Sequence, residues 1–163
     1  MMQVELTING IRKTFETQPS ETLLELLRRN GYTSVKFGCG EGACGACTVI
    51  LNGHPVNSCL VLTGLADGKS VETLEGLGDQ HKPHLLQEAF METGAIQCGF
   101  CTPGMILATK ALLDGNSRPS DEDIRRALDG NLCRCTGYEQ IFDAVKAAAR
   151  RLRAAKKPKA SSK

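Results

Sequence analysis

Eight cysteines in two groups of four constrain the fold of this 163-residue chain more than any other feature. The first group is Cys39, Cys44, Cys47 and Cys59, and the second group is Cys98, Cys101, Cys133 and Cys135. In the first group, the spacing Cys-x4-Cys-x2-Cys followed by a distant fourth cysteine is typical of the ligands of a plant-type [2Fe–2S] cluster. The sequence therefore predicts an iron–sulfur site within residues 39–59.

Disulfides and zinc are the alternatives for these cysteines. Disulfides persist in oxidising compartments, and Cys133 and Cys135 are hard to join within ordinary disulfide geometry. The N-terminal stretch MMQVELTING lacks the basic and then apolar segments of a secretory signal, so a cytoplasmic location with reduced thiols is expected. Zinc prefers two pairs of closely spaced ligands, a pattern that the second group matches loosely and the first group does not match.

Four glycines, Gly38, Gly40, Gly42 and Gly45, alternate with the first three cysteines. A [2Fe–2S] cluster with four thiolates carries about two negative charges when oxidised, and hydrogen bonds to its sulfur atoms stabilise that charge. A loop with minimal side chains can wrap around such a cluster and direct backbone N–H groups at it. We expect these glycines to be positions of close approach and positive φ. The alternative is a flexible glycine-rich linker.

The residues around this loop predict a small α+β domain. Alternating apolar residues flank Asn9-Gly10 and Asn52-Gly53, and both dipeptides are strong hairpin signals. The stretch SETLLELLRRNG between them predicts a helix with Ser20 as its N-cap and Gly31 at its end. The stretch KSVETLEG adds a last strand. A sheet covered by one helix is therefore expected, ending near Gly78.

From residue 79 onward the pattern changes to four amphipathic helices, which predict a helical bundle. The first follows Pro83. Thr102, Ser120 and Thr136 are the expected N-caps of the other three. In this scheme Cys101 and Cys135 each directly precede a cap, so two positive helix termini could face a negative cluster. Cysteines that merely fill a core would not be expected at such positions.

Three motifs together resemble the small iron–sulfur subunit of the molybdenum hydroxylases. They are GCGEGACGACTV, QCGFCTPG and NLCRCTGY, and they contain all eight cysteines in order. The family includes xanthine dehydrogenase, aldehyde oxidase, carbon monoxide dehydrogenase and hydroxybenzoyl-CoA reductase. The resemblance covers residues 3–153 and excludes the charged tail that follows.

The resemblance implies an N-terminal ferredoxin-like β-grasp domain over residues 1–78 and a C-terminal four-helix bundle domain over residues 79–153. Each domain would hold one [2Fe–2S] cluster through its four cysteines, with Gly40, Gly42 and Gly45 in the cluster-binding loop. A basic disordered tail is expected over residues 154–163.

The resemblance also implies partner subunits. A large catalytic subunit would hold a molybdenum–pterin cofactor, either molybdopterin or its cytosine dinucleotide form, and a medium subunit would hold FAD. The expected assembly is a dimer of heterotrimers in which this chain conducts electrons from the pterin to FAD. Gln97 would hydrogen-bond the pterin, and Cys135 would be the cluster ligand nearest to it. The alternative for Gln97 is a helix-end amide bonded to the backbone.

Two other functions are weighed against this one. A stand-alone ferredoxin-like electron carrier would not need a helical domain with a second cluster. A zinc-bearing interaction module with a basic tail would be colourless. The last fourteen residues hold seven Lys or Arg and no aromatic residue, so nucleic-acid binding is not expected. No apolar run approaches the roughly 20 residues of a membrane span, so no such span is expected.

Overall fold

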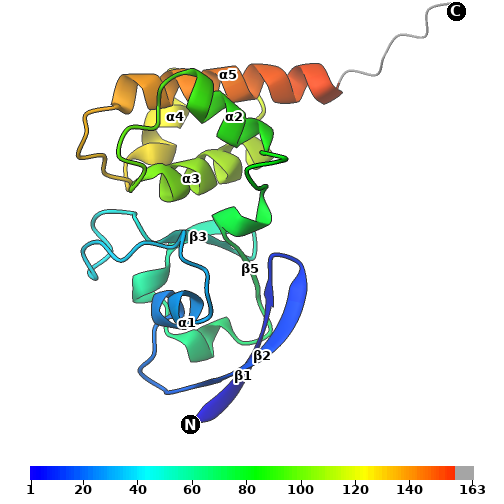
Figure 1. The fold of residues 1–163 in the computed structure, drawn as a ribbon, viewed down its shortest axis with the longest axis vertical. Coiled ribbons are helices and arrows are strands. Elements are labelled where there is room, and N and C mark those ends of the chain that lie inside the picture. Colours follow the sequence, from blue (N-terminus) through cyan, green and yellow to red (C-terminus); the bar gives the residue numbers. More distant parts are fainter. Residues whose placement is uncertain (157–163) are drawn as a thin grey trace, which may run out of the picture.

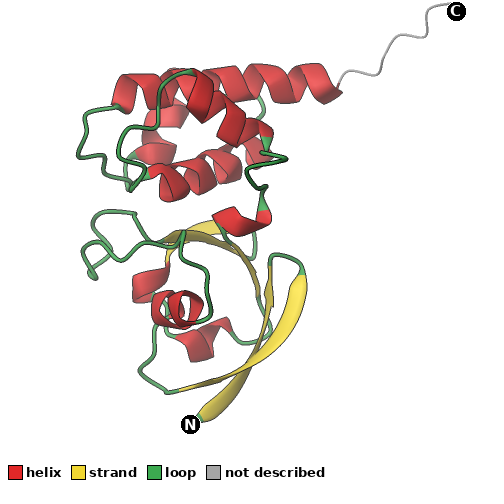
Figure 2. Cartoon of the chain, in the orientation of Figure 1, coloured by secondary structure: helices red, strands yellow, loops and turns green. Residues whose placement is uncertain are grey.

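The computed structural model describes residues 1–156 and places a sheet domain beside a helical domain (Figure 1). The sheet, one helix and several short turns belong to the N-terminal half, and four helices belong to the C-terminal half (Figure 2). This arrangement confirms the predicted α+β architecture of a small sheet domain followed by a helical domain. Among the described residues, no helix combines the length and the apolar character needed to cross a membrane.

Five strands form one mixed sheet in the order β2-β1-β5-β3-β4. The strands are β1 (Met2–Ile8), β2 (Ile11–Thr17), β3 (Thr48–Leu51), β4 (His54–Asn57) and β5 (Ser70–Glu72). β1 pairs in parallel with β5, and all other pairs are antiparallel. Strands β1 and β5, which are far apart in sequence, therefore meet at the centre of the sheet.

Both predicted hairpins are confirmed. Asn9 and Gly10 have φ values of 51° and 81°, and Asn52 and Gly53 have φ values of 47° and 82°. Two successive residues with positive φ define the type I′ turn, whose twist matches that of the flanking strands. The first strand of the second hairpin begins directly after Cys47, and the strands pair Thr48 with Asn57, which brings Cys59 back toward Cys47.

Helix α1 (Leu23–Arg29) covers one face of the sheet, but its N-cap is Thr22 and not Ser20 as predicted. The Thr22 hydroxyl accepts the N–H of Glu25 at 3.3 Å, and the Glu25 carboxylate accepts the N–H of Thr22 at 2.8 Å. Ser20 is followed three residues later by Leu23, which cannot complete such a reciprocal pair. The predicted end of the helix is confirmed, since Gly31 has a φ of 88°.

The apolar face of α1 fills the core of the sheet domain. Its four leucines are buried against the inward-facing residues of β1 and against neighbouring strands; the cluster includes Leu23, Leu24, Leu26, Leu27, Val4, Leu6, Ile8, Val49 and Val71. Cys47 and Cys59 belong to the same buried cluster. Two of the four cysteines in the first group are therefore anchored in the buried core of this domain.

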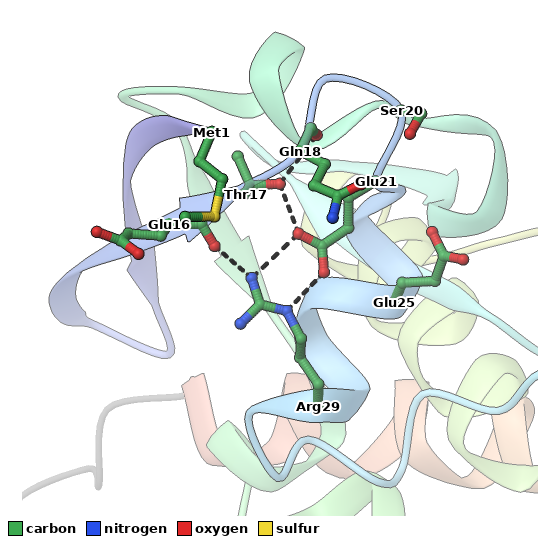
Figure 3. A pocket seen from close by; sticks show the side chains of 8 residues that line it. All are labelled: Met1, Glu16, Thr17, Gln18, Ser20, Glu21, Glu25 and Arg29. Atoms are coloured by element: carbon green, nitrogen blue, oxygen red, sulfur yellow. Dashed lines mark hydrogen bonds and ion pairs between the residues drawn. The ribbon is translucent and has the colours of Figure 1, made fainter.

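At the C-terminal end of α1, Arg29 bonds to β2 and to the loop that connects β2 with α1 (Figure 3). Its guanidinium donates to the two carboxylate oxygens of Glu21 at 2.5 and 3.0 Å, and to the Glu16 carbonyl. The Thr17 hydroxyl also donates to Glu21. A cavity of about 540 Å³ lies at this corner and is lined by none of the eight cysteines.

Short 3₁₀ segments connect the later strands, and four helices follow. The 3₁₀ segments are η1 (Ser58–Leu60), η2 (Thr63–Ala66) and η3 (Leu74–Gly76). The helices are α2 (Leu85–Glu92), α3 (Thr102–Gly115), α4 (Asp121–Leu128) and α5 (Tyr138–Lys156). α5 continues through Lys156, three residues into the predicted tail, and residues 157–163 lie outside the described part of the chain.

The predicted N-caps of the C-terminal helices are confirmed in one case and wrong in two. Ser120 caps α4 through the predicted capping box with Asp123. In α3 the N-cap is Cys101, so Thr102 is already the first helical residue. Thr136 does not cap α5, because it has a φ of 57° and its hydroxyl donates to the Cys135 carbonyl. An N-cap needs an extended backbone, which a left-handed residue cannot supply.

Helix α3 joins the two domains. Its residues from Thr102 to Thr109 are all buried, which is expected of a helix enclosed on every side. α3 contacts β3 and β4 on one side and α2, α4 and α5 on the other. Lys110 of α3 also pairs with Glu72 of β5 at 3.1 Å. The two domains therefore pack directly against each other.

Candidate metal centres

The first four cysteines come from three neighbouring segments. Cys39 and Cys44 lie in the loop between α1 and β3, Cys47 directly precedes β3, and Cys59 lies in η1. The thiol of Cys39 lies beside that of Cys44, and the thiol of Cys47 lies beside that of Cys59. Cys39 also lies close enough to Cys59 for electrostatic interaction. The structure thus brings together all four cysteines of the first predicted site.

Backbone N–H groups of the loop point at this sulfur cluster. The pKa of Cys39 is lowered to about 7, first because the Glu41 N–H donates to its sulfur at 3.4 Å, and further by donors at Cys44 and Ala43. Burial, followed by the neighbouring Cys47, raises the pKa of Cys59 to about 11. Donors aimed at sulfur stabilise thiolates and anionic clusters, as the glycine-rich sequence predicts.

The loop glycines adopt the expected conformations with one exception. Gly40, Gly42 and Gly45 have φ values of 75°, 80° and 67°. Gly38 does not have a positive φ, so that part of the prediction is wrong for it, but a Cβ there would lie 2.6 Å from the Cys44 sulfur. Gly38 is therefore required for space and not for backbone conformation.

The second four cysteines lie in two loops of the helical domain. Cys98 and Cys101 lie between α2 and α3, and Cys133 and Cys135 lie between α4 and α5. The thiol of Cys98 lies beside that of Cys135, and the thiol of Cys101 lies beside that of Cys133. The pKa of Cys98 is lowered, first by the Phe100 N–H. Burial, followed by Cys133, raises the pKa of Cys101 to about 12.

Only one helix begins at this second group, and not two as predicted. α3 begins at Thr102, directly after its N-cap Cys101, whereas α5 begins at Tyr138, three residues after Cys135. The intervening turn passes through the left-handed Thr136. The N-terminal dipole that favours negative charge is therefore supplied beside this group by α3.

In each group the four thiols lie as two neighbouring pairs. Within the described residues 1–156, no three His, Cys, Asp or Glu side chains are arranged to hold a single metal ion. A [2Fe–2S] cluster instead distributes four thiolates over two irons, two to each iron. The two pairs in each group, the N–H donors and the space beside Gly38 fit such a cluster.

The two cysteine groups face a common cavity. It has a volume of about 470 Å³ and is lined by Cys39 and Cys44 from one domain and by Cys98, Cys101 and Cys133 from the other. Figure 1 shows the cyan loop of the first group and the orange loop that precedes α5 on the same side of the molecule. The fold thus places the two sites next to each other across the domain interface.

Gln97 is exposed in the loop between α2 and α3. Among the described residues, no hydrogen bond occupies its side-chain amide, and the amide nitrogen lies against Gly137, where a Cβ would approach it to 3.3 Å. α2 ends five residues before Gln97. In this conformation Gln97 is therefore not a helix-end amide bonded to the backbone, which was the alternative.

Sequence reasoning missed two residues beside the second group. The Tyr138 hydroxyl accepts the N–H of Cys133 at 2.7 Å, and Asn131 is buried and bonded to the first cysteine loop. Both residues lie within the motif NLCRCTGY, but neither side chain could be assigned a partner from spacing. The partner of Tyr138 depends on the shape of the cysteine loop between α4 and α5, and the partners of Asn131 depend on how the two domains pack.

Comparison with known families and structures decides what these sites hold. Residues 6–74 match the family described as the 2Fe-2S iron-sulfur cluster binding domain, and residues 73–146 match the [2Fe-2S] binding domain. The nicotinate dehydrogenase small FeS subunit of Eubacterium barkeri is 56% identical over 149 residues, covering 91% of this chain and 95% of that protein. The xanthine dehydrogenase iron-sulfur-binding subunit of Escherichia coli O157:H7 is 48% identical, covering 87% of this chain and 91% of that protein.

The chain belongs to the small iron–sulfur subunits of the molybdenum hydroxylase family.

Solved structures agree with this assignment. Quinoline 2-oxidoreductase from Pseudomonas putida 86 matches with a TM-score of 0.88 and 44% identity, covering 94% of this chain and 96% of that chain. The aldehyde oxidoreductase of Desulfovibrio desulfuricans ATCC 27774 matches with a TM-score of 0.92 and 47% identity, and this chain spans 17% of it. The ferredoxin-like and helical domains of the iron–sulfur subunit are thereby confirmed.

The iron–sulfur subunit carries two [2Fe–2S] clusters and transfers electrons within a molybdenum-dependent oxidoreductase. A stand-alone ferredoxin-like carrier is not favoured, because the relatives that match over nearly their full length are enzyme subunits.

Proposed function

We propose that this subunit conducts electrons from a molybdenum–pterin site in a large catalytic subunit to FAD in a medium subunit. The observation that carries this proposal is the shared cavity between the two cysteine groups, since a relay needs its carriers close together. When bound, each cluster supplies one-electron chemistry. The residues of the chain hold the two clusters and set their separation.

The eight cysteines are the proposed ligands, four to each cluster. Cys39, Cys44, Cys47 and Cys59 would hold the N-terminal cluster, and Cys98, Cys101, Cys133 and Cys135 would hold the C-terminal one. The proximity of the thiols within each group supports this assignment. Gly40, Gly42 and Gly45 would let the first loop pass close to its cluster.

The C-terminal cluster is the proposed entry point for electrons. Gln97 would hydrogen-bond the pterin through its exposed amide, which offers both a donor and an acceptor. Cys135 pairs with Cys98 beside this residue and would be the ligand nearest to the pterin. The N-terminal cluster would then pass the electron to FAD.

Exposed apolar side chains near both sites support the presence of partner subunits. Phe37 and Leu60 lie near the first cysteine group, and Phe100 and Leu132 lie near the second. Exposed apolar surface of this kind commonly marks a protein interface. We propose a cytoplasmic dimer of heterotrimers, a location in which the free thiols of the described chain would stay reduced before cluster insertion.

Co-expression of this chain with the proposed large catalytic subunit and the proposed medium FAD subunit tests this function. The three chains should purify together, and substrate should bleach the visible absorption of the clusters in the complex but not in the isolated subunit. If substrate reduces the molybdenum site while the clusters stay oxidised, the proposed route is wrong.

A further inference from the structure

The loop that carries Cys133 is bonded directly to the loop that carries Cys44. The side-chain amide of Asn131, which is only 6% exposed, donates to the Gly45 carbonyl at 2.9 Å and to the Thr48 hydroxyl at 3.2 Å. The Gly45 and Thr48 oxygens are themselves 2.7 Å apart, so they share the donor side of this amide in a three-centre hydrogen bond. Asn131 spans the domain interface within two residues of a proposed ligand on each side.

The acceptors of this amide are themselves held in place. The Gly45 carbonyl also accepts the Thr48 N–H at 3.1 Å and the Thr48 hydroxyl at 2.7 Å. The Thr48 hydroxyl thus donates to Gly45 and accepts from Asn131. These three residues form a closed and buried set of hydrogen bonds, in which moving one member breaks at least two bonds.

A backbone bond accompanies this set. The Leu132 N–H donates to the Cys44 carbonyl at 2.9 Å, so one hydrogen bond and one peptide unit separate the backbones of Cys44 and Cys133. The contact has no spare room, because a Cβ on Gly45 would lie 2.3 Å from the Gly130 carbonyl oxygen. A Cβ on Gly104 would likewise lie 2.5 Å from the Gly45 carbonyl oxygen.

We propose that Asn131 is a positioning residue that fixes the separation of the two iron–sulfur sites. The inference rests on the proposed ligand sets of the two clusters. Electron transfer between fixed carriers weakens steeply with distance, so a clamp between the two cluster loops controls the relay without touching either cluster. Loss of the Asn131 amide removes the buried hydrogen bonding to Gly45 and Thr48 at the point where the loops meet.

Pulsed EPR on the full chain tests this role. With both clusters reduced, the dipolar coupling between them reports their separation and its spread. In Asn131→Ala we expect unchanged iron content and an unchanged visible spectrum. The dipolar coupling should become weaker and more widely distributed. If Asn131→Ala loads both clusters and keeps the wild-type coupling, the proposal is wrong.

Two matched controls distinguish the proposed role of Asn131 from the loss of any side-chain amide and from the loss of any contact between the domains. Asn57 donates its amide to the Gly42 carbonyl at 2.8 Å, within the first domain only, so Asn57→Ala should keep the wild-type coupling. Lys110→Met removes an ion pair between the domains away from the cysteine loops and should also keep it. An equal loss of coupling in Lys110→Met would show that the whole domain interface, and not Asn131, sets the separation of the two sites, and it would overturn the proposal.

Should Asn131→Ala load fewer than two clusters, Thr48 provides a second test. Thr48→Val removes the hydroxyl that accepts from Asn131, and Thr48→Ser retains it. The proposal requires a weaker coupling in the valine variant and a wild-type coupling in the serine variant, and identical coupling in the two contradicts it. Iron content and reduction by substrate in the complex test the proposed function separately, so its failure is distinguishable from failure of the clamp.

Discussion

Gly45 must be glycine for two reasons, its backbone conformation and the lack of space around it. It has a φ of 67°, which L side chains rarely adopt, and it lies against the backbone of the other domain. Gly53 has a similar φ of 82°, but a Cβ added there would meet no other atom within 4 Å, so only the first reason applies to it. A comparison of Gly45 with Gly53 therefore separates the cost of backbone strain from the cost of crowding.

We therefore expect Gly45→Ala to destabilise the chain more than Gly53→Ala. Left-handed strain alone costs of order 1–3 kcal/mol, and the 2.3 Å approach to the Gly130 oxygen adds a clash with backbone that cannot rotate away. Urea unfolding of the two variants, compared with wild type, measures the difference. Equal losses would show that the interface yields to the extra methyl group.

At the scale of secondary-structure elements, local signals predicted the turns well and the helix starts less well. The Asn-Gly hairpins and the Ser120–Asp123 box were predictable because their partners lie within three residues. The start of α5 was not, because the left-handed Thr136 lies in a turn whose shape depends on the cysteine loops packed around it. The motif predicted the positive φ of Gly40, Gly42 and Gly45 but not the conformation of Gly38, and the partners of Asn131 could not be predicted without the domain interface.

Helix α1 provides a prediction on pH. The Arg29 hydrogen bond, aided by Thr17 and opposed by burial, lowers the pKa of Glu21 below its ordinary value of 4.5. A lowered folded-state pKa contributes stability above pH 4.5, and this contribution is lost as the pH falls through the folded-state pKa. Because Arg29 is half exposed and solvent screens the pair, Glu21→Gln should cost about 1 kcal/mol near neutral pH.

This cost should shrink toward zero as the pH falls well below 4.5. Urea midpoints of wild type and Glu21→Gln across pH 3 to 7 would reveal it, with the exposed Glu16 changed to Gln as the control for loss of charge alone. A pH-independent difference would contradict the assignment of the effect to the Glu21 carboxylate.

For the whole molecule, the buried helix α3 makes the two domains one packed unit. The predicted boundary near residue 78 lies between η3 and α2, and it stays a prediction. The sequence indicated two sites in two domains but not that these sites would share one cavity. That arrangement arises because α3 begins directly after Cys101 and packs on β3, which begins directly after Cys47.

In the assembled enzyme, Gln97→Ala should slow reduction of the clusters by substrate while leaving iron content and cluster spectrum normal. The amide is not needed to hold iron, and loss of one hydrogen bond to a cofactor costs on the order of 1–3 kcal/mol in positioning. Stopped-flow absorbance measures the rate, and Gln80→Ala, in the segment between the domains, is the control. A wild-type rate in Gln97→Ala would remove the proposed pterin contact.

Spin quantification by EPR, combined with iron and zinc analysis of the purified full chain, tests the central claim most directly. Two clusters, each with two irons and two sulfides, predict two unpaired spins per chain after complete reduction and iron without zinc. A single spin per chain, or zinc in place of iron at either cysteine group, would contradict the account of two iron–sulfur sites facing each other across the domain interface.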